Sequence, residues 1–395
     1  MMNIENLISS RTASLRPSGI RRFFDIANEM EGVISLGVGE PDFKTPYSVR
    51  RAGIENLQMG KTAYTANAGL AELRSAISRY MERKFNLNYD PQTEVLVTVG
   101  GSEAIDLCIR AFVNPGEEVL IPEPCFVAYA PIVTMTCGVP VPIKTVAENH
   151  FRLTAKQLED AITDKTKVLV LPYPNNPTGA VMRREHLEEI AEVLRKHNIV
   201  VLSDEIYAEL TYNGRHVSIA SIDGMKERTI IVNGFSKTFA MTGWRLGFAT
   251  GPAPAIKQMT KLHQYAIMCA PTTAQYAAIE ALDHCEENIR QMREEYNMRR
   301  RFIVDAFNKI GLHTFEPEGA FYIFPCIQST GMTSDEFCER LLYSKKVAVV
   351  PGTAFGSSGE GFVRVSYSYS VNHLNEAVKR IGEFVEEVRQ GQHKD

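Results

Sequence analysis

The 395-residue sequence has no long apolar run, no block of charge of one sign and no closely spaced pair of cysteines. Nothing approaches the roughly 18 continuous apolar residues of a membrane span, so no transmembrane helix is expected. Residues 1–16 lack the apolar core of a secretory signal, which predicts a cytoplasmic protein. The 43 basic and 47 acidic residues, a net charge of −4, are interspersed. We therefore expect neither nucleic-acid nor membrane partners, and favour a small-molecule ligand.

The cysteines argue against two kinds of structural site. Seven are present, an odd number, and no two form a C-x-x-C pair. Neither a disulfide framework nor a zinc site is predicted, and we expect no bound metal. Reduced, mostly buried thiols are expected at Cys108, Cys125, Cys137, Cys269, Cys285, Cys326 and Cys338.

Short apolar, β-branched runs alternate with helical patterns through residue 250. The runs cover residues 95–99, 118–121, 168–171, 199–202, 229–232 and 246–249. Apolar residues at the spacing of one helix face lie between these runs, at Ile105, Cys108, Ile109 and Phe112 and again at Leu187, Ile190, Ala191 and Leu194. Near-continuous apolar strands joined by helices indicate a mostly parallel sheet with helices on both faces, a three-layer α/β fold.

The pattern of charged and apolar residues changes near residue 275. A long charged helical stretch is followed by short strands at 321–324 and 346–350 and by two terminal helices, which indicates a smaller α+β domain. The predicted division is an N-terminal arm of residues 1–16, a large domain of residues 46–280, and a small domain of residues 17–45 and 281–395. A cleft between the two domains is the expected place for a ligand.

Polar residues follow several predicted strands, and the carboxyl ends of parallel strands are where ligands gather. Gly100 and Gly101 follow the first strand and open a helix, where backbone N–H groups can hold a phosphate, although such turns are often plain βα connections. An Asn-Pro loop with Asn176 follows the third strand and presents an amide or simply turns the chain. Asp204 and Tyr207 follow the fourth, with Asp204 also a candidate helix cap.

Lys237 follows the strand at residues 229–232. A solvated lysine, with a pKa of about 10.4, is protonated and a poor nucleophile, whereas burial and the neighbouring cation Arg245 favour the neutral amine. The ordinary alternative is a lysine that reaches water from the end of a strand. A neutral amine at this position can form a Schiff base.

The four strand ends together supply a phosphate site, an amide, a carboxylate with a phenol, and a lysine. Pyridoxal phosphate needs a lysine for its aldehyde, an acid for its ring nitrogen, donors to its phenolic oxygen and a cradle for its phosphate. The sequence therefore predicts a pyridoxal-phosphate enzyme.

The chain also resembles the class I aminotransferases among the fold-type I pyridoxal-phosphate enzymes, from about Pro17 to the last helix. Residues 234–247, around Lys237, fit the family signature across fourteen positions. The other matching segments are residues 37–43, 63–65, 176–179, 204–207, 319–322 and 363–366.

This resemblance implies a role for each strand end. Lys237 would hold the cofactor as an internal aldimine and, once released by substrate, move the proton between substrate Cα and cofactor. Asp204 would keep the ring nitrogen protonated, and Phe126 would stack on the ring. Asn176 and Tyr207 would bind the phenolic oxygen. The phosphate would be held by Gly101, Ser102, Glu103, Ser236, Arg245 and, from the neighbouring subunit of a homodimer, Tyr64.

For the substrate, the resemblance implies that Arg364 binds the α-carboxylate with Gly39 and Asn176 nearby, and that the segment around Ile20 covers the site. Alternation along residues 364–370 also allows a solvent-facing Arg364. The implied reaction transfers an amino group from an L-amino acid to a 2-oxo acid, 2-oxoglutarate by expectation, in two alternating half-reactions.

The sequence does not identify the side chain of the amino acid that donates the amino group. Some similar bacterial aspartate aminotransferases carry a lysine after the paired glycines to hold a distal carboxylate, where this chain has Ser102. Arg21 and Arg22 could replace it, or could be solvated helix residues. Acidic, aromatic, branched-chain and acylated diamino acids all remain candidates.

Two other classes share the fold. One is a pyridoxal-phosphate lyase or decarboxylase, of which a C–S β-lyase is the main alternative. The other is an aminotransferase-like regulatory domain, which would need an attached basic DNA-binding module that residues 1–16 do not supply.

Overall fold

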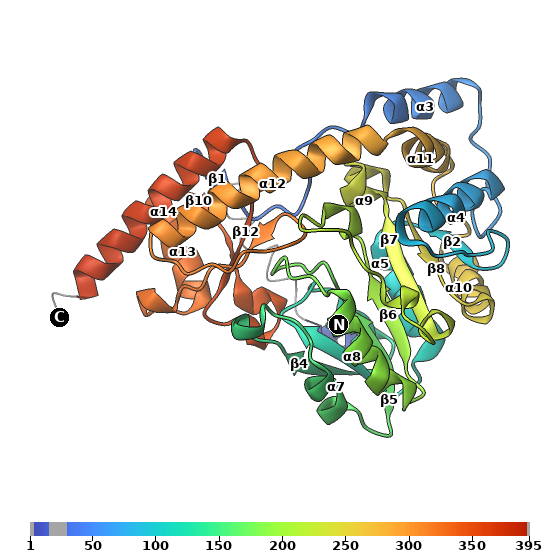
Figure 1. Ribbon diagram of the computed structural model, residues 1–395, viewed down its shortest axis with the longest axis horizontal. Coiled ribbons are helices and arrows are strands. Elements are labelled where there is room, and N and C mark those ends of the chain that lie inside the picture. Colours follow the sequence, from blue (N-terminus) through green and yellow to red (C-terminus); the bar gives the residue numbers. More distant parts are fainter. Residues whose placement is uncertain (1–3, 16–29, 393–395) are drawn as a thin grey trace.

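The computed structural model describes residues 4–15 and 30–392. At its centre is a seven-stranded sheet with the order β2-β8-β7-β6-β5-β3-β4 (Figure 1). Neighbouring strands are parallel except at β8, which runs antiparallel to both β2 and β7. The strands are β2 (Val95–Thr98), β3 (Glu118–Glu123), β4 (Val139–Lys144), β5 (Thr166–Leu171), β6 (Val200–Asp204), β7 (Thr229–Gly234) and β8 (Gly247–Thr250).

Each of the six predicted apolar runs forms a strand of this sheet, which confirms the mostly parallel α/β prediction. Strand β4 was not predicted from the sequence. Its segment carries Pro140 and Pro142 and is largely solvent-accessible, so it lacks the apolar run of a central strand. Proline cannot donate to a ladder, and β4 accommodates two prolines because it lies at the edge of the sheet.

Helices cover both faces of the sheet, as the alternation of side chains shows. Leu96 and Ile230 pack into one apolar core with α5, α6 and α10, whereas their neighbours Val97 and Ile231 pack into another with α4 and α11. Helices α7 and α8 cover the remainder of that second face. The helices are α4 (Ala71–Phe85), α5 (Gly100–Phe112), α6 (Tyr129–Met135), α7 (Ala155–Ala161), α8 (Arg184–Arg195), α10 (Ala253–Ala266) and α11 (Thr272–His284).

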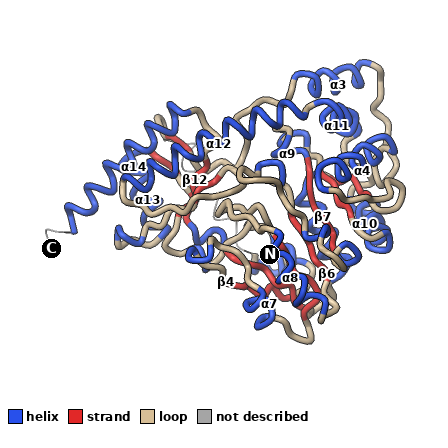
Figure 2. Tube along the Cα trace, viewed as in Figure 1, coloured by secondary structure: helices blue, strands red, loops and turns tan. Residues whose placement is uncertain are grey.

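A smaller α+β unit has its own apolar core. The long helix α12 (Glu286–Lys309) places Ile289 in the core shared with α11 and Tyr296 in the core of the small unit, so it joins the two parts (Figure 2). The other elements of the small unit are β1 (Ile34–Ser35), β9 (Tyr322–Ile323), α13 (Ser334–Lys345), β10 (Val347–Ala348), β11 (Val350–Pro351), β12 (Val363–Ser366) and α14 (Val371–Gln392).

The prediction of two terminal helices after the short strands was wrong. Helix α13 lies between β9 and β10, and α14 alone follows β12 in the described chain. The strands of the small unit are two to four residues long, too short for a clear alternating pattern, which explains the misplaced order. The domain boundaries proposed from the sequence stay a prediction.

All seven cysteines are free thiols, four of them buried. No helix within residues 4–15 and 30–392 is long and apolar enough to cross a membrane. The same residues contain no cluster of three or more His, Cys, Asp or Glu side chains that could hold a metal ion.

Candidate active site

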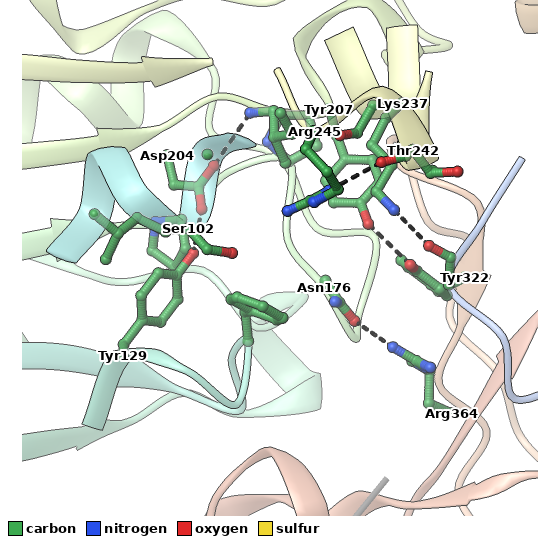
Figure 3. Close-up of a pocket in the computed structure, with 18 residues that line it drawn as sticks. Ser102, Tyr129, Asn176, Asp204, Tyr207, Lys237, Thr242, Arg245, Tyr322 and Arg364 are labelled. Carbon is green, nitrogen blue, oxygen red and sulfur yellow. Dashed lines mark hydrogen bonds between the residues drawn. The ribbon is translucent and has the colours of Figure 1, made fainter. Parts of the chain in front are cut away.

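A cavity lies where the carboxyl ends of the parallel strands meet the small unit (Figure 3). Because β2, β3, β5, β6 and β7 point the same way, the segments that follow them converge on one edge of the sheet. The predicted residues that line the cavity are Gly39, Gly101, Ser102, Phe126, Asn176, Asp204, Tyr207, Ser236, Lys237, Arg245 and Arg364.

Lys237 is carried by the short helix α9 (Phe235–Thr238), directly after the buried strand β7. Its ammonium does not reach into bulk water but donates to the backbone oxygen of Gly39 across the cavity. Burial lowers the pKa of Lys237 to about 8; Glu40 opposes this shift, and the guanidinium groups of Arg364 and Arg245 add to it. The structure thus shifts this amine toward its neutral form, in the direction that the sequence indicated.

Asp204 ends strand β6 and is buried. The hydroxyl of Tyr129 donates to its Oδ2 at 2.6 Å, and the N–H of Ile206 donates to its Oδ1 at 3.2 Å. Burial raises the pKa of Asp204, while these two hydrogen bonds oppose the rise. Asp204 does not cap the next helical turn, η3 (Ala208–Leu210), whose N-cap is Tyr207.

The glycine turn after β2 opens α5 beside a cation. Gly100 has a φ of +78°, and a Cβ there would come within 2.8 Å of the Arg245 Nη2 atom. A Cβ on Gly247, in the neighbouring strand β8, would lie 2.6 Å from the backbone carbon of Gly100. Glycine at both positions lets the helix N-terminus approach the guanidinium closely. The N–H groups and dipole at this helix N-terminus, together with Arg245, could hold an anion in the part of the cavity that Ser102 and Ser236 also line.

The Glu103 side chain, in contrast, turns away from the cavity. Its Oε2 accepts from the backbone N–H of Val99, and its Oε1 lies 2.7 Å from Nδ1 of the fully buried His263 on α10. The predicted contact of the Glu103 N–H with the phosphate stays a prediction. The observed role of its carboxylate is to tie the start of α5 to the end of β2 and to α10.

Arg364 lies on β12 and is 2% exposed, so the solvent-facing alternative was wrong. Its Nη1 donates to the Asn176 Oδ1 at 2.9 Å, and its Nη2 donates to the backbone oxygen of Gly37. The Arg364 Nε is buried and has no hydrogen-bond partner among the described residues. A buried, unpaired donor on an arginine that lines a cavity indicates a site that an acceptor completes.

Tyr207 and Tyr322 meet at the wall formed by the small unit. Their hydroxyl oxygens are 2.8 Å apart, and the ring of Tyr322 lies 4.5 Å from the Arg364 guanidinium carbon. A Cβ on Gly39 would lie 2.5 Å from the Tyr322 hydroxyl, which explains a glycine there. Although Tyr207 follows a strand of the large sheet, its ring packs in the core of the small unit.

Tyr129 and Tyr322 were not predicted as site residues from the sequence. Both are buried aromatic side chains, and an isolated aromatic is by default part of a core. Tyr129 stands three residues after Phe126, and Tyr322 ends a segment that matches the family. The closeness of Tyr129 to Phe126, and the place of Tyr322 in a segment that matches the family, were the signals in the sequence that could have identified them.

Three expectations concern Tyr64 and residues that the structure does not describe. Tyr64 is 81% exposed and lies outside the cavity of its own chain, so its role in a neighbouring subunit stays a prediction. Ile20, Arg21 and Arg22 lie outside the described residues.

Comparison with known proteins decides the family. Residues 31–381 match the model for aminotransferase class I and II. The chain belongs to this aminotransferase family. It is 54% identical to a putative aminotransferase, YugH, of Bacillus subtilis (strain 168), over 96% of this chain and 98% of that protein. It is 48% identical, over the same shares, to an aspartate aminotransferase of Pyrococcus abyssi.

Solved structures agree with this assignment. The crystal structure of an aromatic aminotransferase from Pyrococcus horikoshii OT3 matches with a TM-score of 0.89 and 46% identity, over 94% of this chain and 99% of that one. The resemblance drawn from the sequence motifs is thereby confirmed, as is the fold-type I architecture.

Aminotransferases of this family use pyridoxal phosphate, and the cavity fits that cofactor. The N-terminus of α5 with Arg245 suits its phosphate, the buried Asp204 suits a ring nitrogen that carries a proton, and the partly neutral Lys237 suits its aldehyde. The chain is a pyridoxal-phosphate-dependent aminotransferase.

Proposed function

We propose that this aminotransferase moves the amino group of an L-amino acid to 2-oxoglutarate, with Lys237 as both cofactor anchor and proton carrier. The observation that carries this proposal is the place of Lys237. It lines the same cavity as Asp204, at the end of β6, and Arg364, on β12, and its pKa is lowered to about 8. A lysine whose pKa lies close to neutral pH can take a proton from one carbon and return it to another.

The other groups around Lys237 have distinct proposed tasks. When bound, pyridoxal phosphate supplies an electron sink for the bond broken at the substrate Cα. Asp204, fixed by Tyr129, would keep the ring nitrogen protonated through a charge-assisted hydrogen bond. Tyr207 and Asn176 would donate to the phenolic oxygen. Phe126 would lie against the ring.

Arg364 would bind the α-carboxylate of the amino acid. Its position is fixed before substrate arrives, because Asn176 and the backbone of Gly37 hold two of its nitrogens. A planar guanidinium of fixed orientation suits a carboxylate, and binding energy is then not spent on ordering the side chain. Gly39, which lies close to the Arg364 guanidinium, would add a backbone contact to the same carboxylate.

We also propose a homodimer in the cytoplasm whose subunits share their active sites. Large apolar side chains are exposed on α3 (Tyr47–Gln58), on the following loop and at the end of α10, and a second copy would cover them. They are Tyr47, Ile54, Leu57, Met59, Tyr64, Tyr265, Ile267 and Met268. The loop and the end of α10 lie together, since the Asn67 side chain donates to the Met268 backbone oxygen.

A visible absorbance spectrum of the cofactor-loaded protein tests this proposal. A true donor removes the band of lysine-bound cofactor, and 2-oxoglutarate restores it. A panel of acidic, aromatic, branched-chain and acylated diamino acids identifies the donor class. Release of pyruvate and ammonia without amine transfer would instead support the C–S β-lyase, which none of the comparisons favours.

A further inference from the structure

Tyr322 touches two residues of the proposed site, Arg364 and Tyr207. It is 1% exposed and lies on β9, opposite Ser366 of β12 in an antiparallel pair. Arg364 is two residues from Ser366 and so on the same face, within diagonal reach of the Tyr322 ring. The ring therefore lies against the guanidinium, 4.5 Å from its carbon, while the hydroxyl extends past it to Tyr207.

The two hydroxyl oxygens lie 2.8 Å apart, and either hydroxyl can donate the hydrogen bond to the other. Burial raises the pKa of both tyrosines, and the Arg364 guanidinium opposes this rise in each. The guanidinium carbon lies 4.5 Å from the centre of the Tyr322 ring, and a neighbouring cation makes a phenol a better donor. This geometry favours a hydrogen bond donated by Tyr322 and accepted by Tyr207.

This arrangement leaves the proton of Tyr207 free for another acceptor. Among the described residues, Tyr322 is the hydrogen-bond partner of the Tyr207 hydroxyl, and both side chains line the cavity (Figure 3). A hydroxyl that accepts one hydrogen bond donates a stronger one, because the two bonds polarise each other.

We propose that Tyr322 is a positioning residue whose hydroxyl and ring have separate roles. Its hydroxyl orients and strengthens Tyr207 as a donor to the phenolic oxygen of the cofactor, and its ring supports the guanidinium of Arg364 for the substrate carboxylate. The inference rests on the proposed function, since it takes the phenolic oxygen as the acceptor for Tyr207. It adds a residue that the sequence motifs did not assign.

Tyr322→Phe tests the hydroxyl alone, because it keeps the ring beside Arg364. The visible band of lysine-bound cofactor changes as the linkage to Lys237 loses its proton, and donation to the phenolic oxygen lowers the pKa of that change. We expect the variant to raise this pKa by about half a unit, the scale of one neutral hydrogen bond. The KM for the amino acid should stay within about twofold, since ground-state carboxylate binding is intact.

Two further variants separate the ring from general damage. Tyr322→Ala also removes the support of Arg364, and should raise KM about tenfold through the loss of a cation–π contact and of packing. Tyr367→Phe is the matched control, because Tyr367 is a fully buried tyrosine of the same unit whose hydroxyl bonds to the Ala320 backbone oxygen at 3.1 Å, outside the cavity. It should leave the spectral pKa unchanged.

The outcomes distinguish this inference from the function on which it rests. If the wild-type protein shows no visible band with pyridoxal phosphate, the proposed function fails. If the wild type titrates and Tyr322→Phe titrates at the same pKa, the inference about the hydroxyl is overturned and the function stands. An equal shift in Tyr367→Phe would also overturn it, because the effect would then come from any buried hydroxyl.

Discussion

The hydroxyl of Tyr129 donates to the Oδ2 of Asp204 at 2.6 Å, which joins helix α6 to the end of strand β6 inside the cavity. Burial raises the pKa of Asp204, and this bond opposes the rise by favouring the charged carboxylate. An Asp204 without it would hold a proton more readily and would lose much of its ability to keep the cofactor's ring nitrogen charged.

Replacement of Tyr129 by phenylalanine should therefore weaken catalysis without unfolding the protein. We expect kcat to fall about tenfold, which corresponds to one hydrogen bond to a charged group. Steady-state kinetics measure the effect. Tyr173→Phe is a suitable control, since Tyr173 is equally buried but bonds to the Phe151 backbone oxygen outside the cavity. Equal losses in both variants would contradict a specific role for Tyr129.

Lys237→Ala should remove the visible band of lysine-bound cofactor and lower kcat by at least about a thousandfold, because nucleophile and proton carrier are lost together. The phosphate site at α5 is untouched, so the variant should still bind pyridoxal phosphate, measurable by equilibrium dialysis. Normal amine transfer by this variant would show that another lysine does the work.

The lowered pKa of Lys237 also predicts how the cofactor-free protein responds to pH. Between pH 8 and about 10.5, the lysine is protonated when unfolded and neutral when folded, so the unfolded state binds more protons. Stability should consequently rise with pH through this window. Other groups titrate there too, so the readout is the difference between the wild type and Lys237→Met in urea unfolding. We expect that difference to change by about 2 kcal/mol.

Arg364→Lys should lower kcat/KM by about a hundredfold, mainly through KM. Lysine keeps the charge but cannot form two parallel hydrogen bonds, nor reach both Asn176 and the Gly37 backbone as the guanidinium does. The absorbance of the resting cofactor should remain. A variant that binds amino acids as tightly as the wild type would place the carboxylate elsewhere.

Shared active sites can be tested by complementation. Tyr64→Ala and Lys237→Ala homodimers should each be weak or inactive, but a mixed dimer contains one site with Lys237 from one subunit and Tyr64 from the other. Random mixing at equal amounts should restore about a quarter of the wild-type activity, since half of the dimers are mixed and each has one intact site. No recovery after verified subunit exchange would exclude the proposed role of Tyr64.

The fold and most of the site could be predicted because strand ends carry two signals at once. The apolar run at residues 199–202 indicates a buried strand, and a carboxylate two residues later, at Asp204, indicates a ligand or a helix cap. The same holds for Lys237 after β7. Parallel strand direction then brings these residues together without any knowledge of side-chain contacts.

What escaped prediction depended on contacts between distant segments. The role of Tyr129 is visible only once α6 lies beside β6, and the burial of Arg364 only once β12 pairs with β9 and β11. Likewise, the direction of the Glu103 side chain depends on His263, 160 positions away. Local pattern carries no information about such pairs.

Tyr207 follows strand β6 of the large sheet, yet its ring is packed among residues of the small unit. Because Tyr207 is proposed to bind the phenolic oxygen of the cofactor, the packing of the small unit should influence the visible spectrum. Any loosening of the small unit, by mild denaturant, temperature or a distant substitution, should shift the visible spectrum before helix content falls. The visible spectrum of the bound cofactor would then report on the packing of the small unit.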